Sequence, residues 1–208
     1  MYQLTAPTEQ LRAALETALL CASKDTTLPI LCAVHVSIED DALTADATDR
    51  YRISRYTFEL TEPYKGDRRE WIIAAADLKS WVSALKKARR TPTVVVSLPD
   101  TEELGTGSLA LNIEGQPVLN ARTIDGDYPR ISSLFNRPDE QDNDLHAIGF
   151  NPDYLADMAK TAKAASHIRH APLRMEAAAA VRPVFFTTET PDGADWTGLL
   201  MPVRLPVD

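Results

Sequence analysis

The sequence predicts an α+β fold built from three repeats of one β-α-β-β-β unit. Three times a short apolar segment runs into an amphipathic helical pattern that opens with a helix-start signal. Runs of β-type residues follow each helical pattern, and successive helix starts lie roughly 70 residues apart. Self-similarity at a fixed spacing is typical of a repeat architecture, so we expect the three units to share one local fold.

The first unit opens with an apolar segment at residues 1–5. We expect a helix from Pro7, because the fixed φ angle and the missing N–H of proline suit the first helical turn. The apolar face of this helix consists of residues at helical spacing, namely Leu11, Leu15, Ala18 and Ala22. The strands expected after it are residues 30–38, 42–47 and 52–60.

The second unit opens with residues 71–74, and its helix is expected to be capped by Asp77. One face of this helix carries Leu78, Trp81, Leu85 and Ala88. The strands expected after it are residues 93–98, 108–113 and 117–124.

The third unit opens with residues 146–150 and continues into a helix with Asn151 as its cap and Pro152 behind it. The apolar face of this helix is formed by Leu155, Met158, Ala162 and Ala165. The strands expected after it, at residues 173–177, 184–188 and 197–203, are shorter and less regular than those of the other units.

Two polar segments mark the expected boundaries. Residues 61–69 (TEPYKGDRR) have the proline, glycine and charge of a connection between units. Residues 136–144 (NRPDEQDND) have no apolar side chain except Pro138 and should form an exposed linker. We therefore expect a two-unit domain at residues 1–135, a linker at 136–144 and a single unit at 145–208. A single unit leaves a sheet edge unpaired, and such edges tend to find partners.

The bulk properties narrow the class of protein. The chain has 208 residues, and its formal net charge of -8 argues against a protein that coats nucleic acid with its whole surface. Cys21 and Cys32 both lie among apolar residues, so we expect two reduced core cysteines. The sequence shows neither a signal peptide nor a membrane span, and we expect a cytoplasmic protein without a membrane partner.

Basic side chains are concentrated on two of the expected helices. On the second helix Lys79, Lys86 and Arg90 fall within one narrow sector, and Lys87 and Arg89 flank it. On the third helix Lys160 and Lys163 share a face, which His167 joins if the helix extends that far.

The first helix differs, because Arg12 is accompanied there by Glu9 and Glu16. A basic stripe is often only the solvated side of a surface helix. The alternative is a surface that contacts phosphates without reading the base sequence. The repetition of the stripe on equivalent helices of an acidic chain favours this alternative.

Four short motifs relate the chain to a known family. They are TLPIL (residues 27–31), ATDRYRIS (47–54), DGDYPRI (125–131) and LLMPVRL (199–205). With these motifs in the same order and spacing, the chain resembles the bacterial sliding clamp, the beta subunit of DNA polymerase III. Each domain of that family has two β-α-β-β-β units. By this resemblance residues 1–135 correspond to the middle domain and 145–208 to the second half of the last domain, which describes a shortened clamp.

The resemblance implies a DNA clamp fold in which the sheets lie outside and the helices line a hole for duplex DNA. Such a ring binds DNA without sequence preference and keeps a tethered polymerase near the primer end. The expected DNA-facing residues are Lys79, Lys86, Lys87, Arg90, Lys160 and Lys163.

The resemblance also implies a pocket between the middle and last domains that binds short peptides of client proteins through apolar anchors. The residues that match the family's pocket positions are Leu31, Thr48, Arg50, Tyr51, Arg52, Ile53, Pro129, Leu134, Leu200, Met201, Pro202, Val203 and Arg204. Arg50 stands where the family usually has a small residue, often glycine, which would narrow the groove or change which peptides fit. For Ile53, Leu134 and Leu200 ordinary core packing is the alternative.

Catalysis is not expected. The chain has no P-loop, no GxGxxG after a strand, no HExxH and no CxxC. His146, His167 and His170 lack the spacing of a metal site, so we expect no metal and no cofactor.

The sequence therefore predicts a processivity clamp whose partners are duplex DNA, a DNA polymerase or other replication proteins, and optionally a clamp loader. A family ring has about twelve units by the resemblance, so a three-unit chain favours a homotetramer over a dimer. The alternative function is a non-encircling module that binds or sequesters clamp clients.

Overall fold

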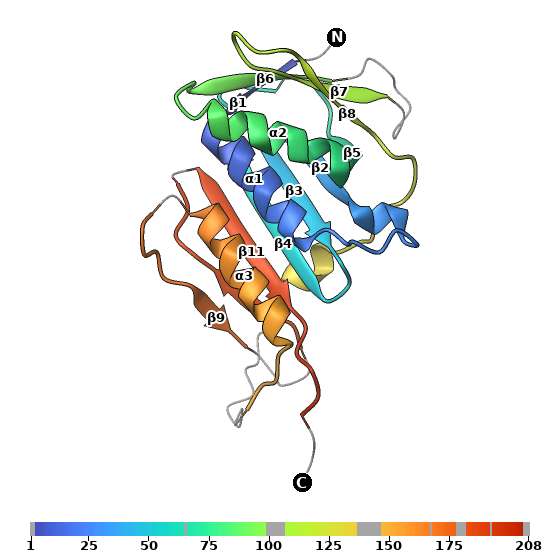
Figure 1. The fold of residues 1–208 in the computed structure, drawn as a ribbon, viewed down its shortest axis with the longest axis vertical. Helices are drawn as coiled ribbons and strands as arrows, with labels where there is room; N and C mark the ends of the chain where they lie inside the picture. The colour runs from blue at the N-terminus through green and yellow to red at the C-terminus, as the bar shows by residue number, and fades with distance from the viewer. Residues whose placement is uncertain are drawn as a thin grey trace.

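In the computed structural model, helices cover one side of two β-sheets (Figure 1). The structure describes residues 3–64, 66–98, 107–136, 147–166, 168–177, 182–191 and 193–205. The α+β class and the repeated units expected from the sequence are confirmed, with one difference in the third unit that is described below.

The first unit closely follows the predicted order. It contains β1 (Gln3–Pro7), α1 (Thr8–Cys21), a 3-10 turn (Pro29–Cys32), β2 (Ala33–Glu39), β3 (Ala42–Thr48) and β4 (Arg52–Glu59). Helix α1 begins at Thr8, one residue later than predicted, and Pro7 immediately precedes it. The first predicted strand is shorter than expected because its opening residues form the 3-10 turn.

The second unit contains β5 (Arg69–Ala74), α2 (Ala75–Lys87), β6 (Thr93–Ser97), β7 (Ser108–Asn112) and β8 (Leu119–Arg122). The prediction that Asp77 caps α2 is wrong, because the helix begins at Ala75. The Asp77 carboxylate instead accepts hydrogen bonds from the backbone N–H and the guanidinium of Arg122 at 3.0 and 2.9 Å. It thereby links the first turn of α2 to the end of β8.

The third unit contains α3 (Pro152–Ala165), β9 (Arg174–Glu176), β10 (Val184–Thr187) and β11 (Ala194–Leu200). Asn151 caps α3 as predicted, since its side chain accepts from the backbone N–H of Asp153 at 2.9 Å. The predicted opening strand is absent from the described part of this unit, where Gly149 makes only an isolated bridge to Val203. The greater part of the predicted linker, together with His146 and His167, lies outside the described residues.

The first two units exchange their opening strands. In the described residues one sheet has the order β1-β6-β7-β8 and the other has the order β5-β2-β3-β4-β11-β10-β9. Strand β1 of the first unit thus pairs with β6 of the second, and β5 of the second pairs with β2 of the first. The two units are therefore interlocked, because neither sheet is complete without a strand from the other unit.

The third unit extends the sheet of the first. Strand β11 pairs antiparallel with β4 from Ala194↔Phe58 to Leu200↔Arg52, and the opposite edge, β9, ends the sheet in the described residues. Trp196 on β11 is fully buried, and its indole N–H donates to Ser54 Oγ at 3.0 Å. The third unit is thus joined to the first by a continuous backbone ladder and a buried polar contact.

The main core lies between the helices and the sheets, with α1 packed between α2 and α3 (Figure 1). Its largest fully buried side chains include Trp81, Tyr56, Phe58, Phe186 and Trp196. Burying one such side chain contributes about 2 kcal/mol or more to folding. Cys21 is buried as predicted, whereas Cys32 is only half-buried. None of the helices in the described residues is long and apolar enough to cross a membrane.

Candidate peptide pocket and basic helix face

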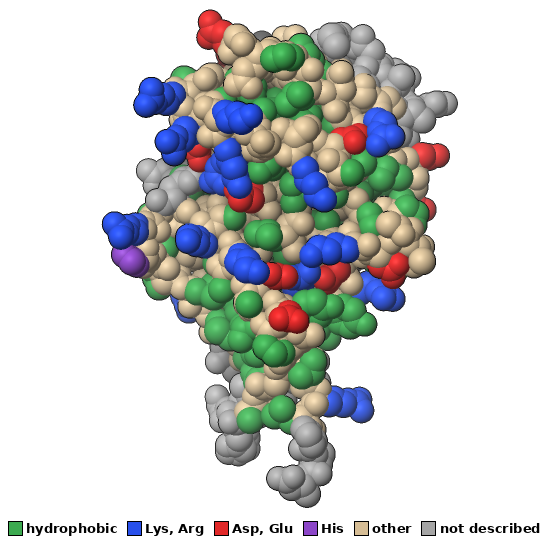
Figure 2. Space-filling model, in the orientation of Figure 1, with side chains coloured by type: hydrophobic (Ala, Val, Ile, Leu, Met, Phe, Trp, Pro, Cys, Tyr) green, Lys and Arg blue, Asp and Glu red, His purple; other side chains and the backbone are tan. Residues whose placement is uncertain are grey.

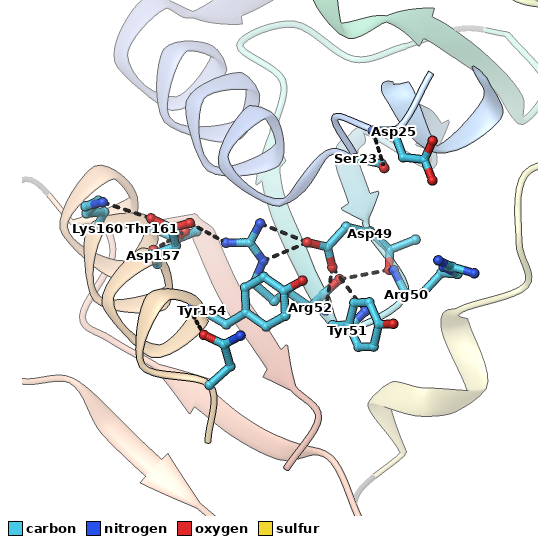
Figure 3. Close-up of polar contacts among 12 residues, drawn as sticks. Ser23, Asp25, Asp49, Arg50, Tyr51, Arg52, Tyr154, Asp157, Lys160 and Thr161 are labelled. Carbon is cyan, nitrogen blue, oxygen red and sulfur yellow. Dashed lines mark hydrogen bonds and ion pairs between the residues drawn. The ribbon is translucent and has the colours of Figure 1, made fainter. Parts of the chain in front are cut away.

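Arg52 occupies the centre of the joint between the first and third units (Figure 3). Its side chain is 6% exposed and pairs with Asp49 Oδ2 at 2.8 Å and with Asp157 Oδ2 on α3 at 2.6 Å. The guanidinium also lies 4.6 Å from the centre of the Tyr154 ring. Burial alone would lower the pKa of Arg52, but the neighbouring carboxylates raise it above its ordinary value. Arg52 is therefore charged in this structure, and its ion pairs link the start of β4 to α3. We call this contact the Arg52 tie.

Side-chain hydrogen bonds form the turn that precedes Arg52. Asp49 Oδ1 accepts from the backbone N–H groups of Tyr51 and Arg52 at 3.0 and 2.8 Å. Thr48 Oγ1 donates to the carbonyl of Arg52 at 2.8 Å and accepts from the N–H of Arg50 at 3.1 Å. Arg50 has a φ angle of 81°, a left-handed conformation that favours glycine. This backbone conformation gives a physical reason for the small residue that the resemblance leads one to expect here.

The C-terminal segment runs beside this turn. The Met201 N–H donates to the carbonyl of Tyr51 at 2.9 Å, and the Val203 N–H donates to the carbonyl of Gly149 at 2.8 Å. Tyr51, Met201 and Val203 are 49%, 38% and 46% exposed. The Tyr51 ring stacks on the ring of Tyr154 with centroids 5.6 Å apart. The structure thus brings the ATDRYRIS and LLMPVRL motifs together and leaves apolar side chains exposed where they meet.

A small apolar cluster lies beside this joint. It contains Ile53, Ile131, Phe185 and Leu199, with Tyr128 and Phe135 packed against it. Arg55 anchors the segment that follows DGDYPRI, because its guanidinium lies 4.1 Å from the centre of the Phe135 ring and donates to Ser132 Oγ at 3.2 Å.

The predicted pocket residues differ in their exposure. Leu31, Thr48, Arg52, Ile53 and Leu200 are buried, so Ile53 and Leu200 pack in the interior. Leu134 is 44% exposed, and Pro129 and Arg204 are exposed as well, whereas Pro202 is partly buried. The exposed residues of the set are the ones that could contact a ligand directly, whereas the buried ones would support the surface.

The structure adds residues that the motif comparison did not assign to the pocket. Asp157 and Tyr154 come from α3, and no motif covers that helix. Asp49 lies inside ATDRYRIS and could have been found from the preference of aspartate for turns.

A cavity of about 980 Å³ lies next to this site and was not predicted from the sequence. Its lining includes His35, Asp46 and residues 124–132, so the DGDYPRI motif forms one wall. Burial alone would raise the pKa of Asp46, but hydrogen bonds from Arg55 and His35 hold it below its ordinary value. The His35 ring stacks on Tyr128 with centroids 5.1 Å apart. Pro129 is the one predicted pocket residue in this lining.

Lys and Arg side chains gather on the face of the molecule that carries the helices (Figure 2). All of the predicted DNA-facing residues are exposed: Lys79, Lys86, Lys87, Arg90, Lys160 and Lys163. Arg90 lies beyond the end of α2, which corrects its predicted place on that helix.

Two of these lysines already have acidic partners. Lys86 Nζ contacts Glu16 Oε1 at 2.6 Å, and Lys160 Nζ contacts Asp157 Oδ1 at 2.8 Å. On α1 the guanidinium of Arg12 pairs with both Glu9 and Glu16, and its side chain is 11% exposed. Among the three helices, α2 and α3 carry the exposed basic groups, and the more neutral α1 lies between them.

The fold is similar to that of solved bacterial sliding clamps. The DNA polymerase sliding clamp of Bacillus subtilis matches with a TM-score of 0.73 at 18% identity, over 99% of this chain and 65% of that one. A sliding clamp of Pseudomonas aeruginosa bound to griselimycin matches with a TM-score of 0.77 at 13% identity, over 98% and 66%. The fold is therefore that of a DNA sliding clamp.

Sequence comparisons identify the family. The family model of the DNA polymerase III beta subunit, central domain, matches residues 5–130, and the chain belongs to this family. The beta sliding clamp of Micrococcus luteus is 37% identical over 121 residues, which cover 56% of this chain and 35% of the relative. That of Streptomyces coelicolor is 30% identical over 132 residues, which cover 63% and 34%. The matches thus span about a third of each relative's length.

Proposed function

We propose that this chain is the subunit of a shortened sliding clamp that encircles duplex DNA and tethers a DNA polymerase or other replication protein in the cytoplasm. The observation that carries the proposal is the exposed basic face of α2 and α3 on a clamp fold (Figure 2). The proposed function is mechanical and includes no bond-making step.

The basic face suits a sliding contact. Lys79, Lys87 and Lys163 project from helices and are exposed. Long flexible ammonium groups bind phosphates as point charges and do not read bases. Such contacts are weakened by salt and allow the protein to move along the duplex.

The exposed apolar surface around Tyr51 and Met201 is proposed as the client-peptide pocket. It lies where β4 and β11 meet, and the Arg52 network holds the turn and α3 together beneath it. Apolar side chains that are held in place in this way suit a short peptide with apolar anchors and need little rearrangement on binding.

The open sheet edges of the chain support a closed assembly. In the described residues one sheet ends at β1 and β8, and the other ends at β5 and β9. About twelve units are expected in a ring that admits duplex DNA, so four chains of three units are proposed rather than two. A clamp loader is proposed as a further partner, since a closed ring must be opened to admit circular DNA.

The test of encirclement is topological. Wild-type protein loaded on nicked circular DNA should be retained during gel filtration and lost after the circle is cut to a linear form. Replacing Lys79, Lys86 and Arg90 together by Glu should lower retention at least tenfold and leave peptide binding unchanged. Equal retention on circular and linear DNA would overturn encirclement and favour a non-encircling module that binds clamp clients.

A further inference from the structure

The opening strands of the first two units show how two units complete one domain. The second strand of each unit receives the opening strand of the other: β2 pairs with β5, and β6 pairs with β1. These ladders run from Ala33↔Ala74 to Ile38↔Arg69 and from Gln3↔Ser97 to Pro7↔Thr93. The exchange is reciprocal, so the two units are related as the halves of a two-fold arrangement.

The third unit contains an opening segment and a second strand, and in the described residues neither forms the ladder seen in the first two units. Its second strand, β9, pairs with β10 on one side, and no strand of the described residues pairs with its other side. Its opening segment, residues 147–150, has the Gly149↔Val203 bridge as its only strand pairing in the described residues, although Ile148 and Phe150 pack against the core. The Ile73↔Thr123 bridge joins the corresponding places of the second unit, where β5 is fully paired. The opening segment is therefore positioned as a strand but lacks its ladder.

The helices show the same difference. Leu15 and Val82 are the eighth residues of α1 and α2, and they are 2% and 7% exposed. Ala159 is the eighth residue of α3, and it is exposed. Met175 on β9 is also 48% exposed, although it lies in the strand that corresponds to the buried β2 and β6. The face that a second unit covers in the first domain is open in the third unit.

We propose that the third unit pairs with the third unit of a second copy of this chain around a two-fold axis. Residues 147–150 of each copy add a strand to β9 of the other, and the two α3 helices pack through Ala159. The occupant is a second copy because the contact needs an opening segment and a second strand that ends its sheet, and the described residues of the third unit offer both. A two-fold contact of this kind uses one patch twice and closes on itself.

The proposed pair places basic groups of both copies on one surface. Lys86, the twelfth residue of α2, forms an ion pair with Glu16, the ninth residue of α1. In α3 the twelfth residue is Lys163 and the ninth residue is Lys160, so both positions are basic. Two copies would therefore bring four lysines together on the helix face, and salt would strengthen the pair by screening their repulsion. DNA retention is expected to respond to salt in the opposite direction.

This inference rests on the proposed ring for its biological role, but the contact itself requires no DNA. Within a ring it joins two chains through their third units, and the edge strands at the other end of each chain stay available for a second contact. Its test in DNA-free solution can therefore fail while circular DNA is still retained, or succeed when DNA binding fails.

The experiment measures mass by light scattering on the full chain, with Ala159→Arg as the disrupting change. Ala156→Arg is the matched control, because the fifth positions of α1 and α2 already hold Arg12 and Lys79. We expect the wild type and Ala156→Arg to share one even-numbered assembly. Ala159→Arg should halve that mass while keeping the wild-type circular dichroism spectrum.

Hydrogen exchange provides the second measurement. The amides of β9 should be protected in the wild type and should exchange at least tenfold faster in Ala159→Arg. A monomeric wild type at about 100 µM, or an unchanged mass and β9 protection in Ala159→Arg, would overturn the proposed contact.

Discussion

Removing the Asp157 carboxylate should weaken the joint between the first and third units. Arg52 is buried and keeps Asp49 as a partner in an Asp157→Ala variant, so its charge would be half compensated. A hydrogen bond to a charged group is worth about 1.5–3 kcal/mol, and fully orphaning a buried charge costs about 3–5 kcal/mol. Because Asp157 is itself 26% exposed, we expect a loss near the lower range, about 2 kcal/mol. In a domain of this size that corresponds to a Tm lower by about 4–8 °C.

The assay is urea and thermal unfolding at pH 7, with Lys160→Ala as the control. Lys160 also contacts Asp157, but its side chain is 65% exposed, and such surface pairs contribute about 0–1 kcal/mol. Equal losses in the two variants, or a loss below about 0.5 kcal/mol in Asp157→Ala, would refute the role assigned to the Arg52 tie.

The ion pairs of Asp157 predict that the stability of the fold depends on pH. The hydrogen bond from Lys160, together with Arg52, lowers the pKa of Asp157 below its ordinary value, although burial opposes this. A lowered folded-state pKa means that the stabilisation is complete above the unfolded value of about 3.9 and is lost as the pH falls through the folded value. The difference in stability between wild type and Asp157→Ala should therefore be constant from pH 7 to about 5 and shrink below about 4. A difference that persists undiminished at pH 2 would contradict this linkage.

Three further changes test other features. Arg50→Gly should stabilise the fold by about 1 kcal/mol in urea unfolding, since glycine accepts the left-handed backbone without strain; a destabilised variant would contradict this. Deleting the chain from Met201 onward should abolish calorimetric binding of a clamp-type peptide, because a central apolar anchor is worth about 2 kcal/mol or more; unchanged affinity in a folded truncation would exclude this pocket. Gly198→Ala should cost about 1–3 kcal/mol because the added methyl group would collide with Met158 and Trp196, and an unchanged Tm would show that α3 can shift away from β11.

The sequence alone was sufficient for the order and type of most elements. Apolar spacing located the three helices, and Asn151 with Pro152 marked the start of the third. The repeat itself was visible because each unit has the same local pattern. Local periodicity carries this information, since it records which side chains share one face of a helix or strand.

The motifs also indicated which distant segments meet. ATDRYRIS and LLMPVRL lie side by side in the structure through the pairing of β4 with β11. The roles of individual residues were less accessible. Asp77 has the chemistry of a helix cap, yet it binds Arg122, because the end of β8 lies within its reach only after folding.

Strand pairing was decided by the tertiary structure. Residues 69–74 have the pattern of a strand, but nothing local indicates that they pair with β2 of the preceding unit. Residues 147–150 have a similar apolar character, yet they form no ladder in the described chain, because a strand exists only where a partner supplies its hydrogen bonds. The residues of a segment thus determine whether it is suited to form a strand. The strand with which it pairs depends on contacts between residues far apart in the chain.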